Sequence, residues 1–175
     1  GGSGRSWGGG RVRVKAVRPM GRSCGGCTAC CTVMAVEELA KPGFTPCGHL
    51  REPDGSGRQG GCGRYGSRPA SCRSFECLWL RGLVLTSEEH RPDRVGLVLA
   101  PTEDRRTLVA REVWPGASAS PAARLLLTEL RRARLRVLVL GPDHHRMLQP
   151  ITVEGASVSG AGASPAALVG ASGRA

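Results

Sequence analysis

The chain has 175 residues, a formal net charge of +11 and few aromatic side chains, so it is long enough for one domain with tails. No stretch reaches the roughly 18 uninterrupted apolar residues of a membrane helix, and the N-terminus lacks the apolar core of a signal peptide. These features argue against a membrane-spanning or secreted protein. They predict a cytoplasmic location without a membrane partner.

The distribution of charge argues against nucleic acid as a partner. Arginine outnumbers lysine 23 to 2, residues 1–23 carry six basic and no acidic side chains, and residues 24–80 carry six basic and five acidic ones. A nucleic-acid-binding domain would need a clustered basic patch within its folded part. We therefore interpret residues 1–23 as a flexible basic arm, within which Met20 is a candidate natural start.

The cysteines dominate the next segment. All eight lie between residues 24 and 77, namely Cys24, Cys27, Cys30, Cys31, Cys47, Cys62, Cys72 and Cys77. The first four have the spacing Cys-x2-Cys-x2-Cys-Cys, and a two-residue gap lets a tight turn direct two sulfurs at one metal ion. Thiols stay reduced in a reducing compartment, which favours metal over disulfides. We interpret all eight cysteines as metal ligands.

The rest of this half has weaker local signals. Residues 32–36 form a short apolar run that could be a strand or the first turn of a helix continuing through residues 37–40. We interpret it as a strand followed by a helical turn that Pro42-Gly43 ends. Residues 52–63 have the composition of a loop. A short helix is expected to begin near Arg68-Pro69, with a break before the last cysteine. Few large apolar side chains are available between residues 24 and 80, so metal is expected to supply part of the stability.

The second half reads as a small α+β unit. Residues 94–101 and 107–114 predict two strands of a hairpin, residues 122–134 a helix capped by Ser120-Pro121, and residues 136–140 a further strand. Residues 151–175 are a low-complexity tail that is expected to be disordered. The predicted fold class is therefore α+β, with a single metal-binding domain over residues 24–150: the metal cluster in 24–80 and the α+β part in 81–150.

With these residues in place, the chain resembles the YkgJ-type cysteine-cluster family, which is named for its CxxCxxCC signature and described as zinc- or iron-chelating. The resemblance covers about a third of the chain and rests on three stretches: the four-cysteine opening, then Lys41-Pro42-x3-Pro46-Cys47-x-His49-Leu50, then Gly61-Cys62-x2-Tyr65-x2-Arg68-Pro69-x2-Cys72-Arg73-x-Phe75-x-Cys77-x-Trp79. It implies metal chelation by the cysteines, and it adds no reaction.

The spacing of the cysteines does not decide between zinc and iron. Zinc and iron, including an iron–sulfur cluster, both take thiolate ligands. In a bacterial ferredoxin run, three residues separate the third and fourth cysteines. Here Cys31 directly follows Cys30, so a ferredoxin-type electron carrier is not supported. Eight thiolates could fill two four-coordinate sites or one polynuclear cluster. Because successive side chains tend to point apart, Cys30 and Cys31 are expected to serve different ions or clusters.

The sequence also predicts roles for residues other than the cysteines. His49 could replace a sulfur as ligand, although a surface position is the more usual one. Arg68 and Arg73 are expected to compensate thiolate charge, with anion binding as the alternative, and Tyr65 and Trp79 to pack over the cluster. Solvated turns are expected for the remaining candidates, Glu37, Glu38, His144 and His145.

The sequence thus predicts a metal-chelating protein, binding zinc or iron, with a structural or redox role and with any protein partner unidentified. Two other classes stay open. One is an iron–sulfur-dependent enzyme or accessory factor in protein or peptide modification, and the other is a zinc-folded nucleic-acid adaptor.

Overall fold

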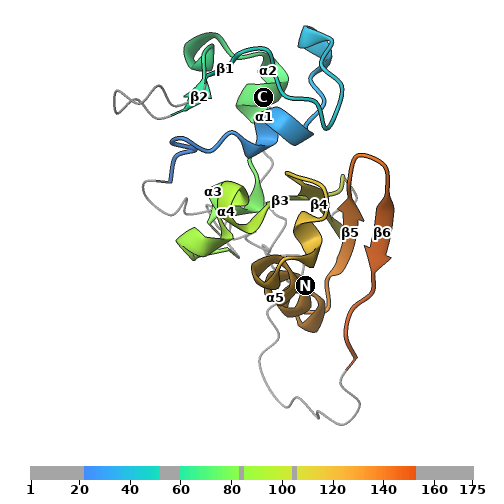
Figure 1. The fold of residues 1–175 in the computed structure, drawn as a ribbon. Coiled ribbons are helices and arrows are strands. Elements are labelled where there is room, and N and C mark those ends of the chain that lie inside the picture. Colours follow the sequence, from blue (N-terminus) through green and yellow to red (C-terminus); the bar gives the residue numbers. More distant parts are fainter. Residues whose placement is uncertain (1–21, 52–59, 83–84, 104–105, 153–175) are drawn as a thin grey trace, which may run out of the picture.

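The computed structural model describes residues 22–51, 60–82, 85–103 and 106–152, and its fold is α+β as predicted. The described residues up to Cys77, here called the cysteine lobe, lie together at one end of the molecule, above a four-stranded sheet (Figure 1). The predicted arm and tail fall outside the described residues except at their inner ends. None of the described helices is both long and apolar enough to cross a membrane.

The sheet has the order β3-β4-β5-β6, with β3 at Leu97–Pro101, β4 at Thr107–Glu112, β5 at Arg136–Leu140 and β6 at His145–Leu148. The predicted hairpin is confirmed because β3 and β4 pair antiparallel. β5 runs parallel to β4, with helix α5 at Pro121–Arg132 as the connection, and β6 pairs antiparallel with β5. The sequence did not predict β6. Its residues are mostly exposed and so lack the apolar alternation of a half-buried strand.

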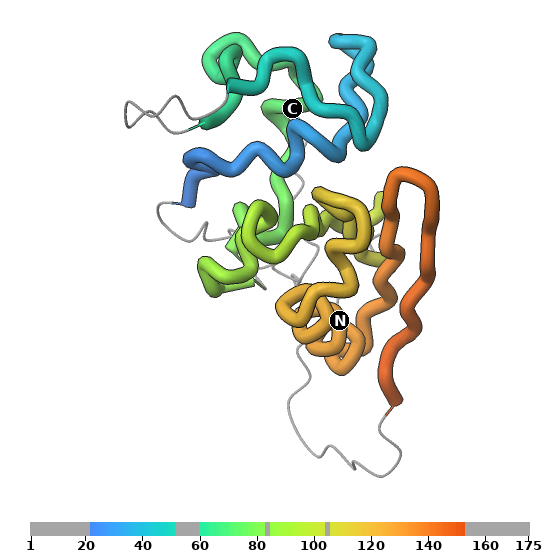
Figure 2. The backbone as a smooth tube through the Cα atoms, in the orientation of Figure 1, coloured from blue at the N-terminus to red at the C-terminus, as the bar shows by residue number. Residues whose placement is uncertain are grey.

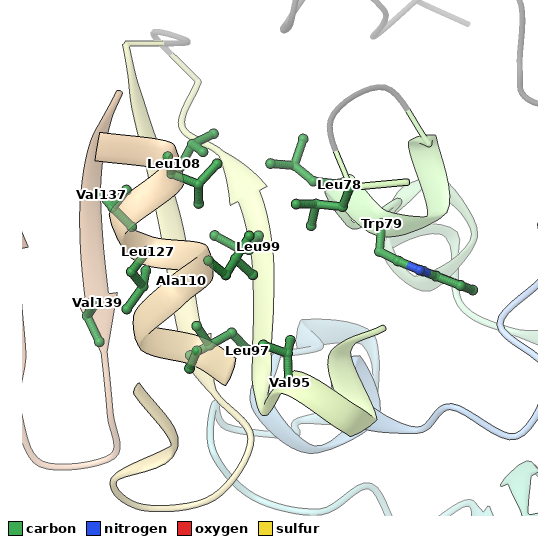
Figure 3. Packing of buried hydrophobic residues seen from close by; sticks show 14 residues of the cluster. Leu78, Trp79, Val95, Leu97, Leu99, Leu108, Ala110, Leu127, Val137 and Val139 are labelled. Atoms are coloured by element: carbon green, nitrogen blue, oxygen red, sulfur yellow. The ribbon is translucent and has the colours of Figure 1, made fainter. Parts of the chain in front are cut away.

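Helix α5 begins where the sequence predicts. The Ser120 side chain accepts a hydrogen bond from the Ala123 amide at 3.3 Å, and Pro121 occupies the first turn, the usual N-terminal arrangement. The helix ends near Arg134, whose φ of 64° is left-handed. Its apolar face packs on the sheet, and Figure 3 shows side chains of α5, β3 and α3 (Leu78–Arg81) meeting in one core.

Strand β3 is buried on both faces, and this joins the two parts of the molecule. Leu97 and Leu99 belong to the core under α5, whereas Val98 points the other way and packs on Ala29 and Val33 of the cysteine lobe. Alternate residues of a strand point to opposite faces. A continuous run of buried residues is therefore what a strand between two layers needs.

The cysteine lobe contains only short elements: α1 at Ala29–Val33, η1 at Glu37–Leu39, β1 at Leu50–Arg51, β2 at Gly61–Cys62, η2 at Tyr65–Ser67 and α2 at Ala70–Ser74. The strand predicted over residues 32–36 is wrong. The helix starts earlier, at Ala29, and of the predicted run only Val36 makes a β-bridge, with Lys41. The predicted helical turn is confirmed as η1, and the break before Cys77 falls at Phe75, which is extended.

The predicted loop over residues 52–63 also needs a correction. Residues 52–59 lie outside the described residues, but β1 and β2 pair antiparallel, with Leu50 opposite Cys62.

Between the lobe and the sheet the chain passes through α3, η3 at Glu88–His90 and α4 at Pro92–Val95 (Figure 2). The strand predicted from residue 94 therefore begins later, at Leu97, because α4 and a left-handed Gly96 precede it.

Arg22 is held at the entrance to the cysteine lobe. Its Nη1 donates to the Trp79 carbonyl at 2.7 Å and to the Leu85 carbonyl, its Nη2 donates to the Thr86 carbonyl, and the guanidinium lies 4.9 Å from the Trp79 ring centroid. This residue of the predicted arm is thus tied to the segment after α3. Trp79 itself is buried in the main core.

A buried carboxylate, Glu112, closes the end of β4. Its Oε1 accepts from the Ser118 amide at 2.9 Å, and its Oε2 accepts from the Gly116 amide at 3.1 Å. His144 and His145 are both exposed, as predicted for solvated residues. His144 Nε2 nevertheless lies 3.4 Å from Oε2 of the buried acid, and His145 begins β6 rather than lying in a turn. Burial works to raise the pKa of Glu112, but the bonds from Ser118 and Gly116, with His144, lower it overall.

The backbone at Gly96 permits a direct test of the fold. Its φ is +78°, and a Cβ there would lie 2.6 Å from the Trp114 ring and 2.8 Å from Ala117. We expect Gly96→Ala to destabilise the protein by about 3 kcal/mol, through left-handed strain plus overpacking, as measured by chemical denaturation. Gly116→Ala is the matched control, because its φ is +76° with nothing within 4 Å. A cost near 1 kcal/mol is expected there from strain alone, and equal effects at the two sites would contradict the packing argument.

Candidate metal centre

The first cysteines are positioned by a tight turn. The Cys27 amide donates to the Cys24 carbonyl at 2.8 Å, and Gly25 has a φ of +51°, a left-handed conformation that favours glycine. The turn leads directly into α1, which carries Cys30 and Cys31. The two-residue spacing therefore does locally what the sequence predicts, since it reverses the chain between two thiols.

The other four cysteines come from four different places in the chain. Cys47 follows η1 and donates its amide to the Cys31 carbonyl at 3.1 Å. Cys62 lies in β2, Cys72 in α2, and Cys77 immediately precedes α3. All eight cysteines are free thiols.

These thiols meet at two adjoining cavities. Seven of them line the main cavity, which has a volume of about 620 Å³. The eighth, Cys77, lines a smaller one of about 30 Å³ together with Cys24, Cys27 and Cys30, which line both. The main cavity lies between the cysteine lobe and the end of β3, because residues 100–103 also line it. Cysteines up to 53 positions apart in the sequence are thus gathered in one region.

Burial sets the protonation of most of these thiols. It raises the pKa of Cys27 to about 11 and raises the pKa values of Cys24, Cys72 and Cys77. A group removed from water disfavours its charged form, so these thiols are protonated at neutral pH unless a cation binds them. Metal binding by such thiols releases protons and is therefore pH-dependent.

Cys30 and Cys31 behave as a pair. Their side chains are hydrogen-bonded to each other, which raises the pKa of Cys30 and lowers that of Cys31. Lys41 and Arg68 also lower the pKa of Cys31. The two side chains therefore interact, and the expectation that they serve different ions or clusters stays a prediction.

Backbone amides are directed at two of the most enclosed sulfurs. Cys27 receives hydrogen bonds from the amides of Ala29 and Asp93, and Cys77 from those of Leu80 and Trp79. Such N–H···S bonds stabilise a thiolate, and groups of this kind tune the metal in thiolate sites. The local backbone thus favours ionised sulfur once a cation compensates its burial.

Two positive side chains lie among the thiols. Lys41 is buried, and its Nζ donates to the carbonyls of Thr32 at 3.2 Å, Met34 at 2.5 Å and Pro42 at 3.0 Å. Arg68 lines the main cavity and lowers the pKa of Cys24 as well as that of Cys31. The predicted charge-compensating role thus has a geometric basis for Arg68, whereas Arg73 instead donates to the Arg68 carbonyl at 2.6 Å.

The aromatic residues differ from the prediction. Tyr65 lines the main cavity but is 54% exposed, and its ring is stacked 3.8 Å from the Arg68 guanidinium. Trp79 lines the smaller cavity from within the core. Only Trp79 is therefore buried beside the cysteines.

His49 and the two glutamates lie as follows. His49 lines the main cavity, with its Nε2 3.4 Å from Arg64 Nη1. Glu38 is exposed, as predicted for a surface turn, and accepts from the Ser71 amide at 3.0 Å and the Ser71 hydroxyl at 2.7 Å, which lowers its pKa. Glu37 is exposed in the same turn. Glu38 thus links η1 to α2, which carries Cys72.

Sequence reasoning missed two features of the site. Lys41 had no assigned role, because a lysine gives no sign in sequence that it will be buried. The pair Arg91 and Asp93 was missed too: both carboxylate oxygens lie 2.6 Å from the guanidinium, and the carboxylate also accepts from the Cys27 thiol. These residues come from α4, which no local pattern connects to the cysteines.

Convergence of the thiols is not the same as a closed ligand set. Within the four described ranges, no group of three or more His, Cys, Asp or Glu side chains is arranged so that it could hold a metal ion. A cysteine side chain has a single rotatable bond that places its sulfur, so a change of rotamer moves the sulfur while the backbone stays in place.

Fold and site together define a small α+β protein with a cysteine-lined cavity between two packed layers. No family model, no curated protein and no solved structure matches the chain. The resemblance to the YkgJ-type family therefore stays a prediction from the motif.

Proposed function

We propose that this chain is a metal-chelating protein of the YkgJ type, whose cysteines hold zinc or iron in a structural or redox role. The observation that supports this most directly is the gathering of free thiols, seven on one cavity and the eighth on the adjoining one. Thiolate is the ligand that zinc, iron and iron–sulfur clusters share. A cytoplasmic location is part of the proposal, because reduced thiols persist there.

The residues around the thiols fit such a group. A metal bound by several thiolates leaves net negative charge, which Lys41, Arg68 and the amides directed at Cys27 and Cys77 would offset. When bound, the metal would supply folding free energy, or electron transfer if it is iron. Cys24, Cys27 and Cys30 line both cavities, so they are the thiols that a metal in either cavity could reach.

A second candidate is an iron–sulfur-dependent enzyme or accessory factor in peptide modification. The size of the main cavity favours it, because about 620 Å³ lies within the range of small-molecule sites, roughly 300 to 1,000 Å³. A purely structural zinc site is closed by its four ligands and needs no such space.

Metal and acid-labile sulfide analysis of protein purified without oxygen tests the proposal, together with the visible absorption spectrum. We expect at least stoichiometric zinc or iron. Iron with sulfide and a brown colour would identify an iron–sulfur protein, and colourless protein with zinc a structural site. Protein that holds neither metal after growth and purification with both supplied, while all its thiols stay reduced, would contradict the proposal.

A further inference from the structure

Much of the wall of the main cavity is formed by residues other than cysteine. Tetrahedral zinc lies about 2.3 Å from each sulfur, so metal held by thiolates fills only the part of the cavity next to them. The remaining lining contains apolar side chains from residues 34–39 and from the end of α2, and positive side chains from the two residues that flank η2 and from α3.

The apolar part comes mainly from one continuous segment. Met34, Val36 and Leu39 line the cavity from the end of α1 and from η1, and Phe75 lines it from the end of α2. Val36 is buried, and the other three are partly exposed. Apolar surface on a cavity wall gains free energy when an apolar group covers it, which a metal ion does not do.

The positive part carries hydrogen-bond donors that have no acceptor among the described residues. The guanidinium of Arg68 donates from Nε to the Tyr65 carbonyl at 3.1 Å and is stacked on the Tyr65 ring, while its two terminal nitrogens have no hydrogen-bond partner among the described residues. By contrast, the Lys41 ammonium donates to three carbonyls. Lys41 thus supplies charge only, whereas Arg68 supplies charge and two terminal nitrogens that donate to no described residue.

These donors define the chemistry of the acceptor. A planar guanidinium with two terminal N–H groups matches a carboxylate through two parallel hydrogen bonds. The stack on Tyr65 and the Nε bond fix the plane of the guanidinium, so little side-chain entropy remains to be lost on binding. Among the described lining residues, the acidic ones are Glu76 and Glu103 and the basic ones are Lys41, Arg64, Arg68 and Arg81.

We propose that the main cavity binds, beside the metal, a carboxylate that carries an apolar group, with Arg68 pairing the carboxylate and the wall formed by Met34 and Leu39 contacting the apolar group. This inference rests on the proposed metal-binding function, since it assigns the rest of the same cavity. It makes the centre an open one that admits an external ligand, and both free small acids and the C-terminus of a peptide have this chemistry.

Calorimetric titration of the full-length, metal-loaded protein with N-acetyl-leucine tests the inference. N-acetyl-leucinamide lacks the carboxylate and N-acetylglycine lacks the apolar group, and each is expected to bind at least tenfold more weakly, as loss of a charged hydrogen-bonded pair or of a buried side chain implies. A tripeptide ending in leucine and its C-terminal amide form the second arm. Tighter binding of the tripeptide acid would identify a peptide terminus as the source, and tighter binding of N-acetyl-leucine a free acid.

Two variants locate the site. Arg68→Gln should weaken N-acetyl-leucine binding roughly tenfold, whereas Arg132→Gln, an exposed arginine at the end of α5, should leave it unchanged. Leu39→Ala covers the case in which Arg68→Gln does not fold: it should weaken N-acetyl-leucine but not N-acetylglycine.

Metal content, measured on the same samples, separates this inference from the proposed function. Metal-loaded protein that binds none of these acids, or that binds the amides equally well, overturns the inference and leaves metal chelation standing. Acid binding by protein that never takes up metal would support the carboxylate site and count against the metal.

Discussion

Replacing Cys27 with serine is expected to remove bound metal and to destabilise the protein by about 4 kcal/mol, because ligand loss and unfolding are coupled in a lobe with few large apolar side chains. Cys27 is the thiol for which the case is strongest. It lines both cavities, and two backbone amides donate to its sulfur. Metal analysis and chemical denaturation of the purified variant measure the two effects.

Thr28→Ala is the matched control for this substitution. Thr28 is the next residue, and its side chain makes no capping hydrogen bond to α1, so metal content should stay at the wild-type level. A strong chelator should destabilise the wild type to the level of Cys27→Ser and leave that variant unchanged. Full metal content and unchanged stability in Cys27→Ser would show that Cys27 is a buried structural thiol.

The second large effect is expected at Glu112, which lines neither of the two cysteine cavities. Glu112→Ala leaves the Ser118 and Gly116 amides without an acceptor, one of them fully buried, and should cost about 3 kcal/mol. Chemical denaturation measures it. Glu129→Ala is the control, because Glu129 is an exposed side chain of α5 and its loss should change stability by less than about 0.5 kcal/mol.

The same carboxylate makes stability depend on acid pH. The pKa of folded Glu112 lies below the ordinary value of 4.5, so the ionised group stabilises the folded state. That contribution is fully present above pH 4.5 and is lost as the pH falls through the lower folded-state value. Glu38 and Asp93 also have lowered pKa values, so the test is the difference between wild type and Glu112→Gln. We expect that difference to shrink towards zero with acidification, and a constant difference would contradict this assignment.

Local sequence was a good guide to the second half of the chain. The Ser120-Pro121 start, the helix after it and the strand over residues 136–140 were all predicted within two residues. Capping, helical spacing and runs of buried residues are set by neighbours in sequence, and α5 and β5 carry strong versions of these signals. Strand β6 was missed because its pairing with β5, rather than any apolar pattern of its own, makes it a strand.

In the cysteine lobe the same reasoning reached less far. Residues 32–36 looked like a strand, yet the helix α1 begins before them, because Val33 and Ala29 must lie on one face to pack on Val98. That contact joins residues 65 or more positions apart. The preference of β-branched residues for strands is weak beside such burial.

Some features of the candidate site could likewise be predicted from the sequence, and others could not. The sequence spacing predicted that the cysteines gather and that Arg68 lies beside them, and seven of the cysteines and Arg68 line the main cavity, whereas metal binding by these thiols stays a prediction. The contributions of Lys41 and of the Arg91–Asp93 pair could not be predicted. Lys41 is buried by contacts within the folded lobe, and Asp93 reaches Cys27 only in the packed structure. Which acceptors a charged side chain finds is a property of the packed structure.

The sequence by itself therefore determined the inventory of this protein: eight thiols in one segment, a short-range turn between the first two, and a hairpin, helix and strand to follow. Tertiary structure alone decided that seven thiols line one cavity, that the side chains of Cys30 and Cys31 interact, and that an apolar wall and the Arg68 guanidinium lie beside them. The physical reason is the range of the interactions. Turns and caps are closed by neighbours in sequence, whereas a cavity is formed by elements that only burial of β3 between two layers brings together.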